Sequence, residues 1–252
     1  MLRSEFELLL NKTLNPSRFK DYAPNGLQVE GKKDIQRVVT GVTASQALID
    51  AAVEYQADAI FVHHGYFWKN EDPRIIGMKH RRIAALIKND INLYGYHLPL
   101  DAHPKLGNNA GLANAIGLLN RSALQLGVPI EESIGIVGEL NESVSAAVFQ
   151  KNVECAVGRD ILFECVNDRA IQRVALCTGG AQGYIEQAIE ADADVFITGE
   201  VSEQTIHVAR EMGIHFIAAG HHATERFGAK AMSAFLSSHG LDSVFIDIDN
   251  PA

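Results

Sequence analysis

The sequence predicts an α/β protein built from two similar α/β domains, and three observations support this fold class. One segment of the chain occurs twice. Each copy places a continuous apolar run on either side of an amphipathic helix, and a second helix and strand follow both copies. Continuous apolar runs are typical of strands buried on both faces of a parallel sheet. Strands that alternate with helices form βαβ units.

The first copy of the repeat begins at Gln36 and the second at Gln172, and the two align without a gap. Each copy is a β-rich run, a turn of small residues, an amphipathic helix, an Ala-Asp turn and a second apolar run. The identical positions are Gln36, Arg37, Val38, Ala52, Glu54, Ala57 and Asp58, which meet Gln172, Arg173, Val174, Ala188, Glu190, Ala193 and Asp194. The repeat therefore predicts the same βαβ unit in both halves.

Both copies continue in the same way. In the first half, a helix around Met78–Lys88 leads to the strand INLYGYH. In the second half, a helix around Ser202–Met212 leads to the strand IHFIAAGH. A further helix, ESVSAAVFQKN, and its flanking strands are expected to belong to the second half.

The segment Leu119–Asn141 contains VPIEES and two glycines, and we expect it to be an irregular spacer. The boundary between the domains is placed within it. The sequence thus predicts a first α/β domain over residues 1–122 and a second over residues 123–252.

Composition and charge indicate an ordinary globular protein. Of the 252 residues, 47% are hydrophobic and 21% are charged. A formal charge of -9 argues against a nucleic-acid polymer or an anionic membrane surface as the partner. The three cysteines form no CxxC pair, which suits a reducing compartment. Because we find neither a signal peptide nor a membrane-spanning run, we expect a cytoplasmic protein.

Histidines and carboxylates follow three of the predicted strands. These candidate ligands are His63, His64, His97, Asp101, His221 and Glu225. Ligands of open α/β sheets bind beyond the carboxyl ends of the strands. A single histidine there is usually a hydrogen-bonded structural residue, and a carboxylate in a first helical turn can simply favour the helix dipole. Six such groups at three strand ends, in two similar halves, favour a metal site.

The residue types limit which metal this site would bind. Imidazole and carboxylate without cysteine exclude a structural Cys-rich zinc site and disfavour an oxygen cage for magnesium or calcium. The set suits zinc, iron, manganese or cobalt. Adjacent residues of an extended strand point to opposite sides, so His63 and His64 serve one site only if the chain turns, as Gly65 allows. A carboxylate between two ions could bridge them, and a bridged pair activates water for hydrolysis.

Two further features have two interpretations each. The turn Thr178-Gly179-Gly180 opens a helix, where its backbone N–H groups could hold a phosphate, or it is only a tight turn of small residues. Trp68 could stack on a base or pack beside the histidines, and packing is favoured.

With these residues assembled, the chain resembles the GTP cyclohydrolase 1 type 2 family, the group related to the NGG-interacting factor proteins. The motifs that carry the resemblance are DYAPNGLQVEG, TGVTAS, FVHHGYFWK, YGYHLPLDAHP, CTGGAQ, ITGEVSEQTIH and AAGHHATE, in the order expected of that family. They cover nearly the whole chain, which is similar to the short bacterial form without the inserted domain.

The resemblance implies two similar α/β domains with a dinuclear metal site in the cleft between them, and a homohexamer built as a ring of dimers. The ligands it implies are His63 and His64 from FVHHG, Asp101 from HLPLD, and His221 with Glu225 from GHHATE. It places His97 beside the metals, where this side chain would support a ligand or transfer a proton. It also places Thr198 and Glu200 at the same cleft, where they would contact substrate.

The function that the resemblance implies is metal-dependent hydrolysis of a nucleotide or a damaged nucleotide, by ring opening of the GTP cyclohydrolase kind. Two divalent transition-metal ions would serve as cofactors, with iron or zinc preferred and manganese or cobalt as alternatives. The alternative function is that of a non-catalytic protein that binds or delivers metal, or acts as a regulatory scaffold.

Overall fold

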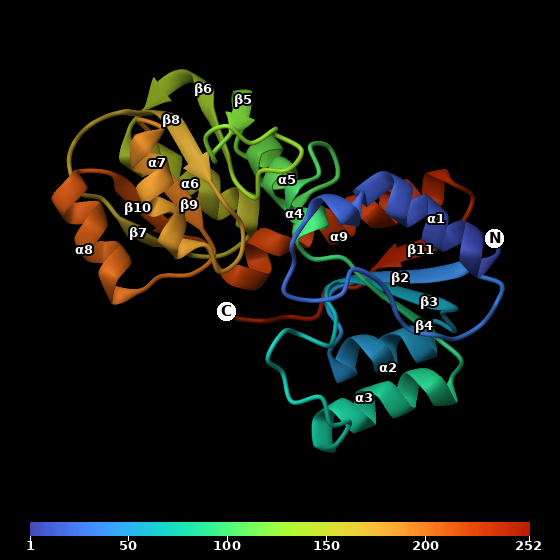
Figure 1. Ribbon diagram of the computed structural model, residues 1–252. Coiled ribbons are helices and arrows are strands. Elements are labelled where there is room, and N and C mark those ends of the chain that lie inside the picture. The colour runs from blue at the N-terminus through green and yellow to red at the C-terminus, as the bar shows by residue number, and fades with distance from the viewer. The chain divides into compact units, whose positions relative to one another are not determined.

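The computed structural model describes residues 1–252 and divides them into two compact units (Figure 1). Unit 1 consists of Met1–Leu100 and Gly228–Asp249, and unit 2 of Asp101–Phe227 and Asn250–Ala252. This division differs from the expected domains, 1–122 and 123–252. Residues 101–122 belong to unit 2, and residues near the end of the chain return to unit 1, where the last strand pairs with the first strand of the repeat.

Unit 1 is a five-stranded sheet covered by helices. Its elements are α1 (Arg3–Leu14), η1 (Pro16–Arg18), β1 (Gly26–Val29), β2 (Arg37–Thr43), α2 (Gln46–Glu54), β3 (Ala59–His64), α3 (Gly77–Lys88), β4 (Asn92–Gly95), the later part of α9 (His221–Ser238) and β11 (Asp242–Phe245). The strand order is β1-β4-β3-β2-β11. All neighbouring strands are parallel except β1, which runs antiparallel to β4.

The two faces of this sheet are covered by different helices. Helices α2 and α3 lie on one face, and α1 with the later part of α9 lies on the other (Figure 1). The ring of Phe6 on α1 packs edge-on against Tyr94 of β4, with centroids 5.0 Å apart. Strand β3 is buried on both faces, as its continuous apolar sequence predicted.

Unit 2 is a six-stranded mixed sheet, also covered on both faces. Its elements are α5 (Asn108–Ala115), β5 (Leu119–Ala123), β6 (Ile136–Val144), α6 (Ala146–Val157), β7 (Leu162–Glu164), β8 (Ile171–Leu176), η2 (Gln182–Tyr184), α7 (Ile185–Glu190), β9 (Val195–Thr198), α8 (Glu203–Met212) and β10 (His215–Ala218). The strand order is β5-β6-β8-β9-β10-β7, in which β8, β9 and β10 are parallel. No helix of either unit has both the length and the apolar surface needed to cross a membrane.

The repeated sequence forms the same arrangement in both units. Strands β1-β4-β3-β2 of unit 1 correspond in order and direction to β7-β10-β9-β8 of unit 2. The Ala-Asp turns also have the same function. Asp58 accepts hydrogen bonds from the backbone amides of Gln36 and Arg37 at 2.9 and 3.0 Å, and Asp194 accepts the equivalent pair at 3.0 and 2.8 Å.

The expected irregular spacer, Leu119–Asn141, is the main error in the predicted elements. It contains β5 and the beginning of β6, which pair antiparallel. Strand β5 has the sequence LNRSA and is largely exposed at the sheet edge. An exposed edge strand needs no apolar pattern because backbone pairing holds it, so the pattern gave no signal.

Candidate metal centre

Three histidines gather at the carboxyl ends of β3 and β4 in unit 1. His63 and His64 are the last residues of β3, and their ring centroids are 4.5 Å apart, so the two rings do not lie on opposite faces. The ring of His97, which follows β4, has its centroid 5.0 Å from that of His63 and 5.8 Å from that of His64. One nitrogen from each ring lies within 4.8 Å of the other two. We call these three residues the unit 1 cluster.

In each histidine of this cluster, Nδ1 lies within hydrogen-bond distance of a protein oxygen. The contacts are His63 Nδ1 with Tyr96 O at 3.2 Å, His64 Nδ1 with Thr43 Oγ1 at 3.2 Å and His97 Nδ1 with Asp21 Oδ1 at 2.7 Å. A carbonyl and a carboxylate can only accept, so His63 and His97 carry a proton on Nδ1, and Nε2 is the ring nitrogen left to bind a metal ion. Metal-binding histidines have this arrangement, because the second ring nitrogen donates to a carbonyl or carboxylate.

Asp21 is a buried acid of unit 1 with several hydrogen-bond donors around it. Only 3% of its side chain is exposed, and it accepts hydrogen bonds from His97, Asn25 and the backbone amides of Tyr22 and Leu98. Burial by itself would raise the pKa of Asp21. The hydrogen bond and charge of His97, together with the amide donors, outweigh burial and lower this pKa to about 2.

Trp68 packs beside the histidines, as the favoured interpretation of the sequence had it. Its ring meets that of His97 edge-on, with centroids 4.9 Å apart and planes at 84°, and lies 5.8 Å from that of His64. Its indole N–H donates to Gly65 O at 3.2 Å. Trp68 therefore forms a wall of the unit 1 cluster.

A second group of candidate ligands lies in unit 2, where β10 leads into α9. His221 begins α9, and its Nε2 lies 3.2 Å from Oε2 of Glu225, one helical turn later. Its Nδ1 lies 2.7 Å from Oε1 of Glu200. The hydrogen bond with Glu225, opposed by burial and reinforced by the charges of both carboxylates, raises the pKa of His221 to about 9. A cation bound here would replace the proton that His221 holds between the two acids.

Asp101, the first residue of unit 2, lies in the short helix α4 (Leu98–Ala102). Only 7% of this residue is exposed, and its Oδ1 accepts from Asn108 Nδ2 at 2.9 Å and from Thr178 Oγ1 at 3.3 Å. Burial, followed by the charges of Asp101 and Glu225, raises the pKa of the Cys177 thiol. We call Asp101, His221 and Glu225 the unit 2 group.

The Thr178-Gly179-Gly180 turn supports the unit 2 group. The amide of Thr178 donates to Asn109 Oδ1 at 2.9 Å, that of Gly179 to Thr224 Oγ1 at 3.0 Å, and that of the following Ala181 to Thr198 Oγ1 at 3.2 Å. These contacts favour the tight-turn interpretation. Thr198, which the resemblance places at the substrate, is fully buried and donates to Gly179 O.

The residues fit a transition-metal site in their chemistry. Every predicted ligand lies in one of the two groups, and both groups offer imidazole nitrogen or carboxylate oxygen without a thiolate. In unit 2, a Cβ added at Gly179 would overlap Glu225 Oε1 and lie 3.3 Å from His221 Nε2, so only glycine leaves room for both side chains.

Sequence reasoning missed the acids and amides that hold the candidate ligands. Asp21 and Asn25 lie in DYAPNG, which contributes to the resemblance but carries no pattern that marks either residue as a partner of His97. Asn108 lies seven residues after Asp101, but no apolar or charge pattern identifies it as the partner of that carboxylate. A supporting residue of this kind depends on contacts between distant segments, which local patterns do not reveal.

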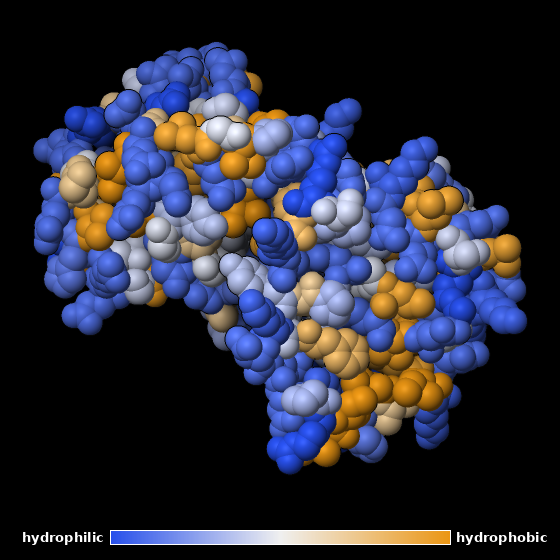
Figure 2. Space-filling model, viewed as in Figure 1, coloured by the Kyte–Doolittle hydropathy of each residue, from blue (hydrophilic) through white to orange (hydrophobic).

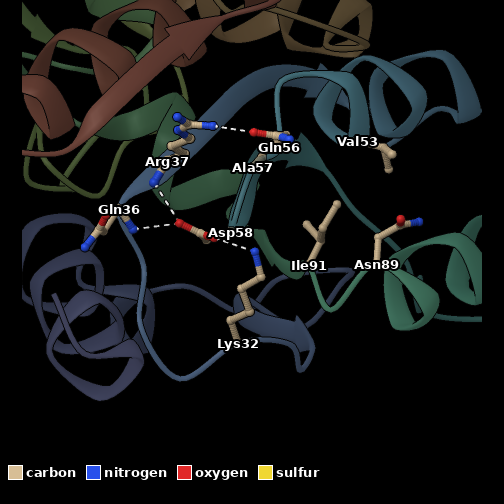
Figure 3. A pocket seen from close by; sticks show the side chains of 9 residues that line it. All are labelled: Lys32, Gln36, Arg37, Val53, Gln56, Ala57, Asp58, Asn89 and Ile91. Atoms are coloured by element: carbon tan, nitrogen blue, oxygen red, sulfur yellow. Dashed lines mark hydrogen bonds and ion pairs between the residues drawn. The ribbon is translucent and has the colours of Figure 1, made fainter.

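A hollow of about 560 Å³ in unit 1 lies at the opposite end of the parallel strands (Figure 3). Arg37 opens β2 and Asp58 precedes β3, so the hollow borders the amino ends of these strands. Its polar groups bind one another, as Lys32 Nζ lies 2.7 Å from Asp58 Oδ1 and Arg37 Nη1 2.9 Å from Gln56 Oε1. Because ligands of α/β sheets bind at the carboxyl ends, we assign no function to this hollow.

Comparisons with known proteins agree over the whole chain. Residues 1–251 match the family described as Duf34/NIF3 (NGG1p interacting factor 3). Proteins of Yersinia pestis and Escherichia coli K12, both named GTP cyclohydrolase 1 type 2 homolog, are 57% and 54% identical, and each alignment covers 100% of both chains. A solved structure described as protein ybgI, of unknown function, has a TM-score of 0.95 at 53% identity over 100% of both chains. The structure of TTHA1606 from Thermus thermophilus has a TM-score of 0.89 at 34% identity, also over 100% of both chains.

Proposed function

Because this chain belongs to the Duf34/NIF3 family, we propose that its two groups of ligands together bind a pair of divalent transition-metal ions. The proposed ligands are His63 and His64 from unit 1, and Asp101, His221 and Glu225 from unit 2. Iron or zinc suits this set best, with manganese or cobalt as alternatives. The observation that carries the proposal is that Nδ1 of His63 and Nδ1 of His97 each contact a protein oxygen. The opposite ring nitrogen, Nε2, is then the one that can face a metal ion.

The proposed activity is hydrolysis of a nucleotide or a damaged nucleotide, by opening of a ring in the base. The names of the relatives point to this substrate class. When bound, a pair of such ions lowers the pKa of water and polarises a substrate atom. The chain itself would supply His97 to accept or return a proton through Nε2, since Asp21 holds its Nδ1. Glu200, with 47% of its side chain exposed, would fix His221 and face the substrate.

The test uses protein purified without oxygen and loaded with iron or zinc. We expect it to release formate from GTP or to open a related purine. Asp101→Ala should abolish this release, whereas Asp50→Ala, which removes an exposed acid of α2 in unit 1, should leave it unchanged. Equal release by the Asp101 variant would remove the site from catalysis. No turnover across a panel of nucleotides, together with rapid exchange of bound metal, would favour the non-catalytic metal-binding alternative.

We also propose that the chain assembles into a homohexamer, a ring of dimers. Apolar side chains are exposed on unit 1 along α3 and the segment before it, as the orange area over α2 and α3 shows (Figure 2). They include Ile75, Ile76, Met78 and Ile87. Exposed apolar areas of this kind often mark protein–protein interfaces. Light scattering during gel filtration should give the mass of six chains, and a monomer mass would contradict the proposal.

A further inference from the structure

The loop between η1 and β1 contacts both the backbone and the side chain of His97. Asn25 Oδ1 accepts from the backbone amide of His97 at 2.8 Å, and Asp21 Oδ1 accepts from its ring nitrogen Nδ1 at 2.7 Å. Asp21 Oδ2 then accepts from Asn25 Nδ2 and from the amide of Leu98, both at 2.9 Å. The backbone and the side chain of His97 are therefore fixed by one loop that is distant in sequence.

We propose that Asp21 is a positioning residue. It fixes His97 with a proton on Nδ1 and with Nε2 facing His63 and His64. This inference rests on the proposed metal-binding function, because it gives Nε2 of His97 a role beside the ions. It assigns to Asp21 the task of setting the ring's tautomer and orientation. Asp21 itself would contact neither metal nor substrate.

The donors around Asp21 require a carboxylate at this position. Each of its two oxygens accepts from two donors, and the carboxylate donates nothing. An asparagine at this position has the same shape, but one of its two terminal atoms is a donor. That NH₂ group must face either His97 Nδ1 and the Tyr22 amide, or Asn25 Nδ2 and the Leu98 amide. The first orientation forces the proton of His97 onto Nε2, and the second opposes two donors within the loop.

Unit 2 holds its histidine in the same way from an unrelated position. Glu200 Oε1 lies 2.7 Å from Nδ1 of His221, the same distance as in the Asp21–His97 pair. Glu200 follows β9, whereas Asp21 precedes β1, so the two acids do not occupy equivalent places in the repeat. The structural repeat does not account for two matching carboxylate–histidine pairs. A common requirement for a fixed Nδ1–H does account for them.

The first test measures the tautomer of His97 in metal-free protein by ¹⁵N NMR of the imidazole rings. Unaltered protein should show His97 protonated on Nδ1 and unprotonated on Nε2. Asp21→Asn should populate the Nε2–H form, and the matched Asp50→Asn variant should not change the spectrum of His97. Signals of His97 that are the same in the Asp21 variant and the unaltered protein would overturn the proposal. This test is independent of any activity.

The second test is a double-mutant cycle on kcat for formate release from GTP by metal-loaded protein. Asp21→Asn should lower kcat by about 100-fold or more, the usual effect of losing a positioned proton-transfer group. In a His97→Gln background the same substitution should have almost no effect, because Asp21 acts through His97. An equal loss in both backgrounds would show that Asp21 serves only the loop. If unaltered protein binds no metal, the proposed function fails, while the tautomer measurement still decides the role of Asp21.

Discussion

A single methyl group at position 179 is expected to separate metal binding from folding stability. Gly179 has φ +72, in the left-handed region, and packs against the unit 2 group. In Gly179→Ala the new Cβ would overlap Glu225 Oε1. That atom is the far end of a flexible side chain, so the chain can relieve the overlap by moving the carboxylate away from its place beside His221.

The two effects have different magnitudes. An L-residue in the left-handed region costs about 1–2 kcal/mol, offset by about 0.4–1 kcal/mol because alanine has less freedom than glycine in the unfolded chain. We therefore expect the backbone effect alone to lower the free energy of unfolding by roughly 1 kcal/mol. Displacing Glu225 removes a proposed ligand, which should weaken metal binding by at least about 100-fold, or about 2.8 kcal/mol.

The matched control is Gly213→Ala. Gly213 has φ +70, almost the same as Gly179, but an added Cβ would meet nothing within 4 Å. Urea unfolding of the metal-free proteins should show a backbone loss in both variants and a further loss at Gly179, because Glu225 leaves its contact with His221. Titration with Zn²⁺ against a chelator should then show unchanged affinity for the Gly213 variant and a large loss for the Gly179 variant.

Equal metal affinities for the two glycine variants would mean that Glu225 is not a ligand or that its position is not decisive. Equal losses of stability would mean that Glu225 keeps its contact with His221 in the Gly179 variant, which would also contradict the prediction.

Two other predictions concern the acids of the repeat and the cysteines. Burial would raise the pKa of Asp58, but hydrogen bonds from Lys32, Arg37 and Gln36 outweigh it and lower this pKa below its unfolded value. Its stabilisation is therefore complete above the unfolded pKa, about 3.9, and is lost as pH falls through the folded pKa. Asp58→Asn should lose about 1–2 kcal/mol of unfolding free energy at neutral pH, and its gap to the unaltered protein should close in acid, whereas exposed Asp50→Asn should change little. A gap that is constant in urea titrations from pH 7 to pH 2 would contradict this. Burial raises the pKa of Cys177, whose thiol donates to Ile134 O at 2.9 Å, while Cys155 and Cys165 are exposed. A thiol reagent should therefore modify two cysteines in folded protein and the third only after unfolding, and rapid modification of all three would be inconsistent with the structure.

The strands and helices of the repeat could be predicted because their sequences combine continuous apolar runs with amphipathic helices. Strand β3 is an example, since its first four residues, AIFV, are all apolar and buried. The domain boundary could not be predicted, because β11 returns to pair with β2 and no local pattern identifies the partner of a strand. Strand β5 was missed because its exposed polar residues resemble a loop.

The candidate site could be predicted in part for a similar reason. His63 and His97 stand at the ends of apolar runs, where polar residues are visible in the sequence. The residues that hold them were not visible. Asp21 reaches His97 from a loop before β1, and Thr178 reaches Asp101 from a turn after β8. These pairs depend on the packing of distant segments, and neither hydrophobic periodicity nor residue spacing encodes them.

Crystals of the protein loaded with zinc or iron, examined by anomalous diffraction at the absorption edge of the metal, would test the central proposal most directly. We expect two peaks about 3.5–4 Å apart, with His63 and His64 of unit 1 and Asp101, His221 and Glu225 of unit 2 as ligands. Peaks confined to one unit, two distant peaks, or no peak in crystals grown with excess metal would contradict it.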